Sequence, residues 1–205
     1  MLFRSIWQYL EEYDEQTLFS VIEILYDHIG VYNYETAEFE NEAQKAEFAE
    51  QINNILRAYK EGYYLEPTNG FIMQMPNGAL REQLEYEGSA LPDSVYEKLA
   101  TDTEMYYRFD ANLEQKKKAI NILADILESE REEVKDIFNA EYEVPKNEHD
   151  KLIFSIVNGY NIRHNRAGQK SDYRKEIWYD WMMQYYTSVI IAFYKLKNKH
   201  NDIDF

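Results

Sequence analysis

The sequence predicts a mainly helical protein, a helical bundle with one small β-hairpin in the N-terminal half. Apolar residues recur at three- and four-residue spacing along much of the 205-residue chain, which is typical of amphipathic helices. Only 7 Gly and 4 Pro are present, fewer than a loop-rich β-sandwich would carry. One Asn-Gly turn between two short apolar runs predicts the hairpin.

Two helical stretches are expected before the hairpin. The apolar spacing within residues 7–29 predicts one or two helices that end near Gly30. The spacing within residues 48–59 predicts a further helix that Gly62 ends. The segment between them, residues 31–43, is acidic and aromatic without a clean period, and we interpret it as a loop or irregular turn.

The hairpin turn is predicted at Pro67–Gly70, where Pro-Thr-Asn-Gly separates two short apolar runs. A second turn is predicted at Pro76–Gly78. A single hairpin is only marginally stable alone, so we expect it to pack on helices.

The rest of the chain predicts a bundle of helices, with a weak domain boundary near residues 105–111. We expect helices over residues 92–101, 112–129, 134–138, 152–159 and 177–196. The last of these is apolar around much of its circumference and is expected to be central. We interpret its Tyr and Trp stripe as core or dimer interface, not as a base-stacking platform. The predicted domains are residues 1–105, with the hairpin, and 106–205.

Composition excludes several classes of protein. The chain has no Cys, which rules out disulfides, thiol nucleophiles and Cys-ligated zinc or iron–sulfur sites. No apolar run approaches the roughly 18 residues of a membrane span, so no membrane partner is expected. The start turns acidic too soon for a signal peptide. We therefore expect a soluble, cytoplasmic protein.

The charge is unevenly distributed along the chain. The net charge is −16, but residues 151–205 hold nine Lys and Arg against five Asp and Glu. Residues 1–150 hold 13 basic and 33 acidic residues. The acidic excess opposes indiscriminate nucleic-acid binding, whereas a local basic site still acts within a Debye length of about 10 Å. The simplest interpretation of residues 1–150 is a solvated acidic surface that maintains solubility. This interpretation does not explain why the net charge of residues 151–205 is positive.

The segment 158–175 concentrates residues suited to chemistry on phosphate. It is longer than a link between packed helices requires, and long loops are often functional. Arginine contacts phosphate with two hydrogen bonds, and histidine moves protons near neutral pH. Together they favour activation of a ribose 2′-hydroxyl without metal or other cofactor. The alternative is a solvated basic loop that pairs with acidic residues. The candidate catalytic residues are Arg163, His164 and Asn165. The candidate substrate-binding residues are Asn161, Arg166, Gln169, Lys170 and Tyr173.

The segments NGYNIRHNRAGQK and EIWYDWMMQYY resemble the C-terminal part of bacterial proteins of abortive-infection type. The C-terminal half, a helical bundle with an Arg/His/Asn cluster before its last helix, is similar to a HEPN domain. INNILRAYKEGYYLEPTNGFIM resembles the domain that precedes HEPN-like domains in such proteins. The resemblance covers residues 17–80 and 112–197. It implies a metal-independent endoribonuclease or RNA-binding protein, a homodimer, and a role in anti-phage defence or a toxin–antitoxin pair.

The sequence departs from the family's catalytic motif, in which Arg is followed by four to six residues and then His. No His stands at that distance from Arg163 or Arg166, and His164 directly follows Arg163. Adjacent side chains on a helix point about 100° apart, so the usual geometry does not carry over. Either the cluster is a variant site or the domain binds without cleaving, and enzyme activity stays open. The alternative function is a non-catalytic helical module that holds RNA or a protein partner, such as an antitoxin.

Other chemistry is weaker. His28 and His149 are isolated and are expected to be ordinary histidines. The acidic clusters at 38–42 and 128–133 are expected to be solvated faces, because no shaped loop accompanies them. No metal site is predicted.

Overall fold

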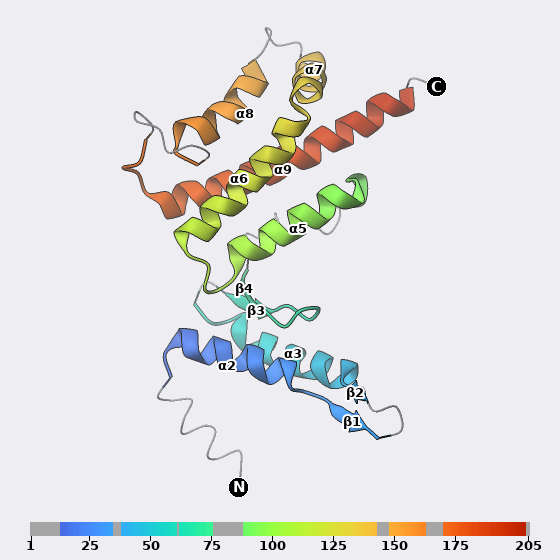
Figure 1. The fold of residues 1–205 in the computed structure, drawn as a ribbon, viewed down its shortest axis with the longest axis vertical. Helices are drawn as coiled ribbons and strands as arrows, with labels where there is room; N and C mark the ends of the chain where they lie inside the picture. Colours follow the sequence, from blue (N-terminus) through green and yellow to red (C-terminus); the bar gives the residue numbers. More distant parts are fainter. Residues whose placement is uncertain are drawn as a thin grey trace. The chain divides into compact units, whose positions relative to one another are not determined.

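The computed structural model describes residues 13–34, 38–60, 62–75, 88–142, 148–162 and 170–203. The protein is mainly helical with a small antiparallel hairpin, as predicted (Figure 1). The chain divides into two compact units. The first comprises residues 1–75 and 107–110, and the second comprises residues 76–106 and 111–205. The sequence suggested one boundary near residue 105, whereas this division places residues 76–106 with the second unit.

Among the described residues of the first unit, two helices and two short strand pairs alternate along the chain. They are α2 (Glu15–Asp27), β1 (Val31–Asn33), β2 (Glu38–Glu40), α3 (Glu42–Leu56), β3 (Tyr63–Leu65) and β4 (Ile72–Gln74). The Asp14 side chain starts α2 by accepting a hydrogen bond of 2.8 Å from the Thr17 amide. The helix α3 begins at Glu42, earlier than the expected residue 48, so the connection between β2 and α3 is short.

The strands β3 and β4 form the predicted hairpin, with Tyr64 opposite Met73. Its turn closes at Gly70, whose φ of +75° is accessible to glycine at little cost. Arg108 forms an isolated antiparallel β-bridge with Met73 of β4. The predicted turn at Pro76–Gly78 lies outside the described residues.

The strands β1 and β2 correct the expectation of a loop over residues 31–43. They pair antiparallel, with Val31 opposite Glu40 and Asn33 opposite Glu38. Val31, Tyr32 and Phe39 are β-branched or aromatic, which favours strands, but three-residue strands are too short to show a period. The local sequence pattern therefore did not reveal the pairing of β1 with β2.

One apolar cluster holds the first unit together. Phe19 lies at its centre, with its ring 4.9 Å from that of Tyr63 and 5.3 Å from that of Phe109. The hairpin packs on the helices, as expected, because its inward residues belong to the same cluster. The buried members are Phe19, Tyr26, Ala49, Leu56, Tyr63, Leu65 and Ile72.

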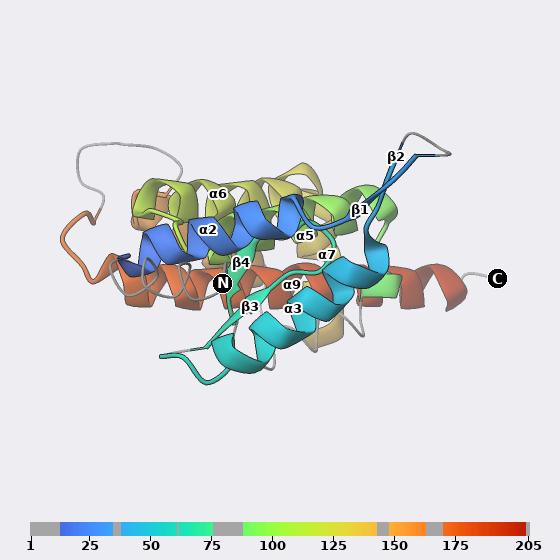
Figure 2. The ribbon, with the colours of Figure 1, turned by 90° about the horizontal axis from the view of Figure 1, so that it is seen from below.

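The second unit is a helical bundle built around one long helix. Its elements are η1 (Gly88–Ala90), α5 (Asp93–Tyr107), α6 (Leu113–Ser129), α7 (Arg131–Tyr142), α8 (Glu148–Gly159) and α9 (Lys175–Ile203). The helix α9 packs along α6 and also contacts α7 and η1 (Figures 1 and 2). The sequence predicts a central helix here, and α9 contacts three other elements of the unit.

Polar contacts connect α9 to its neighbours. The Tyr106 hydroxyl donates to Asp180 Oδ1 at 2.6 Å, and the Tyr186 hydroxyl donates to the Ile153 carbonyl at 2.6 Å. The buried α9 side chains are Tyr179, Met182, Met183, Tyr186, Thr187, Ile190, Ile191, Phe193 and Tyr194. These residues lie on one side of the helix, and the opposite side faces solvent.

Candidate functional site

The candidate site is the connection between α8 and α9. The structure describes its two ends, Tyr160–Ile162 and Lys170–Arg174. It therefore places three of the predicted site residues, which are Asn161, Lys170 and Tyr173. The other five lie outside the described residues, and they are Arg163, His164, Asn165, Arg166 and Gln169.

Hydrogen bonds bring the two ends of the connection together. The Lys170 amide donates to the Gly159 carbonyl at 3.0 Å. The Tyr173 hydroxyl donates to the Tyr160 carbonyl at 2.7 Å. The connection therefore leaves and returns at the same place, the end of α8.

A second hydroxyl completes this anchor. The Tyr179 hydroxyl donates to that of Tyr173, and burial, followed by this bond, raises the pKa of Tyr179. Burial also raises the pKa of Tyr173. Both phenols therefore stay protonated at neutral pH and serve as donors, which fits a structural role.

Asn161 is the residue that turns the chain away from α8. Its φ is +56°, in the left-handed region that Asn enters more readily than most residues. Ile162 follows it, with its amide donating to the Val157 carbonyl at 3.2 Å. Asn161 and Tyr173, predicted as binding residues, therefore both have structural features that explain their residue types, the left-handed backbone of Asn161 and the hydroxyl hydrogen bond of Tyr173.

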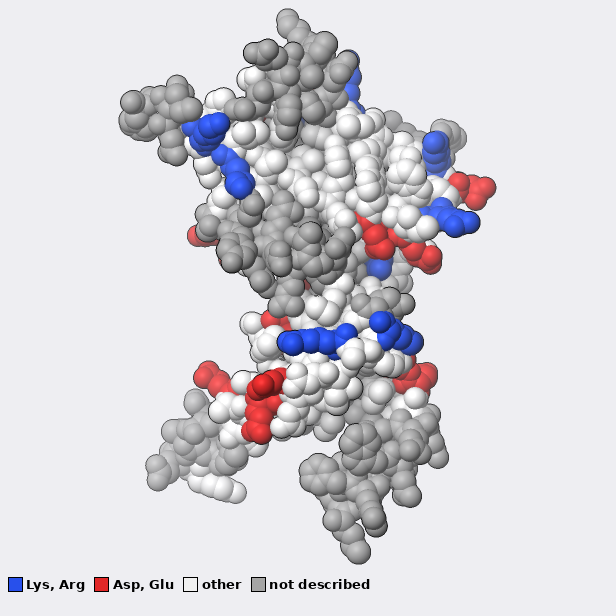
Figure 3. Space-filling model, turned by 180° about the vertical axis from the view of Figure 1, so that it is seen from behind, with Lys and Arg blue, Asp and Glu red and all other residues white. Residues whose placement is uncertain are grey.

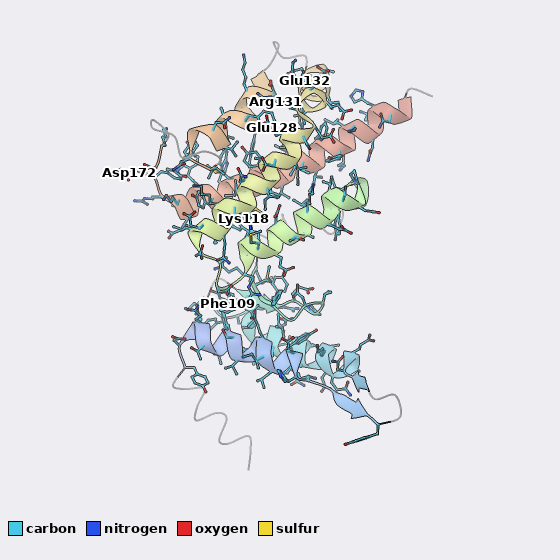
Figure 4. All side chains as sticks on the ribbon, viewed as in Figure 1. Phe109, Lys118, Glu128, Arg131, Glu132 and Asp172 are labelled. Carbon is cyan, nitrogen blue, oxygen red and sulfur yellow. The ribbon has the colours of Figure 1, made fainter. Side chains whose placement is uncertain are left out.

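Lys170 is the exposed member of the three. Its Nζ lies 5.5 Å from the centre of the Tyr160 ring, a cation–π distance. Arg174 is exposed and Lys175 is half-buried, so three cations follow one another at the start of α9. Asp172 and Glu176 are exposed nearby, and Figure 4 shows Asp172 at the outer edge of the connection.

An aromatic ladder continues from the connection onto α9. We define it as Tyr160, Tyr173, Trp178, Trp181 and Tyr185. The Tyr160 ring lies 5.3 Å from that of Tyr173 and 5.0 Å from that of Trp178. The Trp181 ring lies 5.5 Å from that of Trp178 and 5.3 Å from that of Tyr185. These rings form a continuous row of contacts.

Part of this ladder is open to solvent. Trp178 is 36% exposed and Trp181 is 42% exposed. The sequence predicts core or dimer interface for the whole Tyr and Trp stripe, and in the structure its residues differ in burial. Tyr179 and Tyr186 are buried in the bundle, whereas the two tryptophans lie at the surface.

The acidic cluster near the junction of α6 and α7 is occupied by ion pairs. Arg131 pairs with Glu128 at 3.1 Å, and Lys135 pairs with Glu132 at 3.2 Å (Figure 4). Lys197 pairs with Glu130 at 3.3 Å. Within the described ranges, no group of three or more His, Cys, Asp or Glu is arranged to hold a metal ion.

One buried carboxyl group has an unusual pKa. Asp102 on α5 is 2% exposed, and burial raises its pKa to about 7 against the opposing effect of Lys118 and Lys98. Its Oδ2 atom has no hydrogen-bond partner in the part of the chain that the structure describes. The group is enclosed in the bundle, so we assign it to stability and not to the candidate site.

None of the described helices is both long enough and apolar enough to cross a membrane. No known family, curated protein or solved structure matches this chain.

Proposed function

We propose that this chain binds RNA through the connection between α8 and α9. The observation that carries the proposal is the set of cations at the end of this connection. Lys170, Arg174 and Lys175 take part in none of the ion pairs among the described residues. Cations without carboxylate partners are available for the phosphate groups of a nucleic acid.

Several other cations of the protein are already neutralised. Arg131 and Lys197 pair with glutamates, and Arg108 in the first unit lies 3.2 Å from Glu23 and 2.9 Å from Asp110. Other described cations, among them Lys116, Lys117 and Lys118 on α6, also take part in no ion pair among the described residues. The proposal therefore rests on the position of Lys170, Arg174 and Lys175 at this connection, in a chain whose net charge of −16 opposes a generally basic surface.

Cleavage is the further part of the proposal. Arg163 would contact the phosphodiester, His164 would transfer the proton of the 2′-hydroxyl, and Asn165 would orient the substrate. Arg166 and Gln169 would add contacts to the RNA. These roles follow from residue type and from the resemblance to HEPN-like proteins, which also suggests a homodimer and a role in bacterial anti-phage defence or a toxin–antitoxin pair in the cytoplasm.

The experiment incubates the purified protein with total bacterial RNA in the presence of a chelator. Retention of RNA supports binding, and the appearance of fragments supports metal-independent cleavage. We expect Arg163→Ala to weaken binding by about 1.5–3 kcal/mol, the value of a charge-assisted hydrogen bond. We expect His164→Ala to retain binding and to slow any cleavage by about 10²–10⁴-fold.

Three results would contradict parts of this proposal. If no RNA is retained or cleaved, the proposed function is wrong. If RNA is retained intact, the protein binds without cleaving. If Arg163→Ala unfolds the protein, the arginine is a structural residue and its assignment to the site fails.

The second candidate function is a non-catalytic module that binds a protein partner. Ile177, on the first turn of α9, is 61% exposed, and apolar exposure beside tryptophans is common in protein interfaces. Co-purification with one stable protein, together with no affinity for RNA, would favour this function.

A further inference from the structure

The exposed part of the aromatic ladder is not needed to fill the bundle core. The core side of α9 is occupied by residues such as Tyr179, Met182 and Tyr186, each at most 2% exposed. Trp178 and Trp181 remain more than a third exposed in the folded unit. Large aromatic rings are highly buried on average, so two neighbouring exposed tryptophans require an explanation.

The ladder presents its rings in a fixed orientation. Trp181 and Tyr185 are nearly parallel, with an angle of 16° between their planes. Tyr185 is half-buried and supports the Trp181 ring from one side. Trp178 is held in the same way by Tyr160, at an angle of 31°. Rings that are held in place before binding lose little conformational entropy when a ligand stacks on them.

On this side of α9 the charged residue in line with the rings is Arg174. Arg174, Trp178, Trp181 and Tyr185 follow one another at intervals of four, three and four residues, so they lie along one side of the helix. Glu176 and Asp180 fall outside this spacing. The Asp180 carboxylate already accepts the hydrogen bond from Tyr106 on α5.

The surface view agrees with this arrangement. The helix α9 lies behind α6 in Figure 1 and is therefore on the near side in Figure 3. Over the second unit, Figure 3 shows an area without charged side chains, bordered by Lys and Arg on one side and by Lys, Arg, Asp and Glu on the other. Lys170 also lies over the Tyr160 ring at the end of the ladder. Cations beside exposed rings match a ligand that combines phosphates with flat, unpaired bases.

The geometry points to single-stranded RNA as the ligand, with unpaired bases stacked on Trp178 and Trp181 and phosphates held by Lys170 and Arg174. This inference rests on the proposed function and specifies which form of RNA the site accepts. Double-stranded RNA keeps its base faces inside the helix, so it offers nothing to stack on these rings. A protein partner would use the aromatic surface but would not require the neighbouring cations.

The test is a titration with a fluorescein-labelled single-stranded RNA of about 12 nucleotides, within the range that such platforms cover. Binding is followed by fluorescence anisotropy for the wild type and for Trp181→Ala. Trp181→Phe keeps a ring on which a base can stack. Tyr96→Ala is the matched control, because Tyr96 is 45% exposed on α5, outside the ladder. An RNA hairpin whose fully paired stem is closed by a linker without bases is titrated in parallel.

We expect Trp181→Ala to bind the single strand about 5- to 150-fold more weakly, the range measured for loss of one stacked base. Trp181→Phe should recover most of the affinity, and Tyr96→Ala should bind as the wild type does. The hairpin should bind more weakly and should be insensitive to Trp181→Ala. The chain has three tryptophans, two of them in the ladder, so RNA should also quench the intrinsic fluorescence.

Two results would overturn the inference while the proposed function stands. In the first, Trp181→Ala binds as tightly as the wild type, so RNA contacts only the cations. In the second, the hairpin binds as well as the single strand. If Trp181→Ala instead converts a dimer into a monomer without changing RNA affinity, the ladder is covered by a second copy of the chain and the inference is wrong. If no RNA binds any of the proteins, the proposed function itself has failed.

Discussion

Gly70 is a residue at which the backbone and the surrounding packing both require glycine. Its φ of +75° is costly for other residues, and an added Cβ would lie 2.2 Å from the Tyr26 ring. Tyr26 is held in place, because it is 3% exposed and its hydroxyl donates to the Pro67 carbonyl. The Asn-Gly pair in the sequence predicted the turn, but only the structure reveals the ring against it.

We expect Gly70→Ala to lower the free energy of unfolding by about 2 kcal/mol or more, from backbone strain and displacement of Tyr26. Gly159→Ala is the control, because an added Cβ there meets nothing within 4 Å. At the end of α8, that change should be neutral or stabilising by up to about 1 kcal/mol. Urea unfolding followed by circular dichroism compares the two, and equal losses would contradict this account.

Asp102 makes stability depend on pH. Burial raises its pKa from 3.8 to about 7, so the folded protein favours the neutral carboxyl. The associated stability is fully present below about pH 4 and is lost as the pH rises toward 7. We expect Asp102→Asn to match the wild type at pH 4 and to be a few kcal/mol more stable at pH 8. Urea unfolding at both pH values checks this, and a variant less stable at pH 8 would refute it.

Asn112 is the residue that starts α6, and its side chain forms a complete capping box. It accepts hydrogen bonds of 3.0 Å from the Glu114 and Gln115 amides, while the Gln115 side chain accepts from the Asn112 amide at 2.9 Å. Asn41 precedes α3 without any side-chain capping bond. The two asparagines therefore occupy equivalent positions with different contacts.

We expect Asn112→Ala to destabilise the protein by about 0.5–2 kcal/mol, the usual cost of losing an N-cap. Asn41→Ala removes no capping bond and should be nearly neutral. Thermal unfolding of both variants measures the difference. A loss at Asn41 as large as that at Asn112 would show that the capping contacts of α6 do not carry the effect.

At the scale of elements, the sequence was most informative where apolar spacing was regular. Residues 112–129 predicted α6 to within one residue of its observed start. The helix α5 extends to Tyr107. The prediction stopped at residue 101, because the sequence of the last turns lacks a clear apolar period. The strands β1 and β2 were missed because three-residue strands are too short to show an alternating pattern, although their paired residues are close in the sequence.

The candidate site stays a prediction. The sequence pointed to the connection between α8 and α9, but it did not reveal the left-handed backbone of Asn161 or the hydrogen bond from Tyr173 to the Tyr160 carbonyl. It also missed the exposed face of Trp181. Periodicity shows which residues share one side of a helix, but it does not show whether another element covers that side.

At the scale of the whole molecule, charge governs how RNA would bind. The net charge of −16 repels RNA at long range, so affinity must come from local contacts that salt weakens. For a single strand, each phosphate contact contributes about 0.7 to the slope of log affinity against log salt. We expect the double variant Lys170→Ala with Arg174→Ala to reduce this slope by about 1.4.

The control for this measurement is Arg57→Ala with Lys135→Ala, which removes the same net charge from α3's end and from α7. It should leave the slope unchanged, because neither residue belongs to the connection. Equal changes in both double variants would indicate that the overall charge, and not the local cations, determines the salt dependence.

Ultraviolet crosslinking of bound single-stranded RNA, followed by mass spectrometry of the peptides, tests whether RNA bases stack on the ladder. Aromatic rings stacked on bases lie within reach of photochemical bond formation. If bases stack there, crosslinked peptides will come from residues 159–185, with Trp178 or Trp181 at the attachment point. Crosslinks confined to the first unit or to α5–α7, with RNA fully bound, would contradict such stacking.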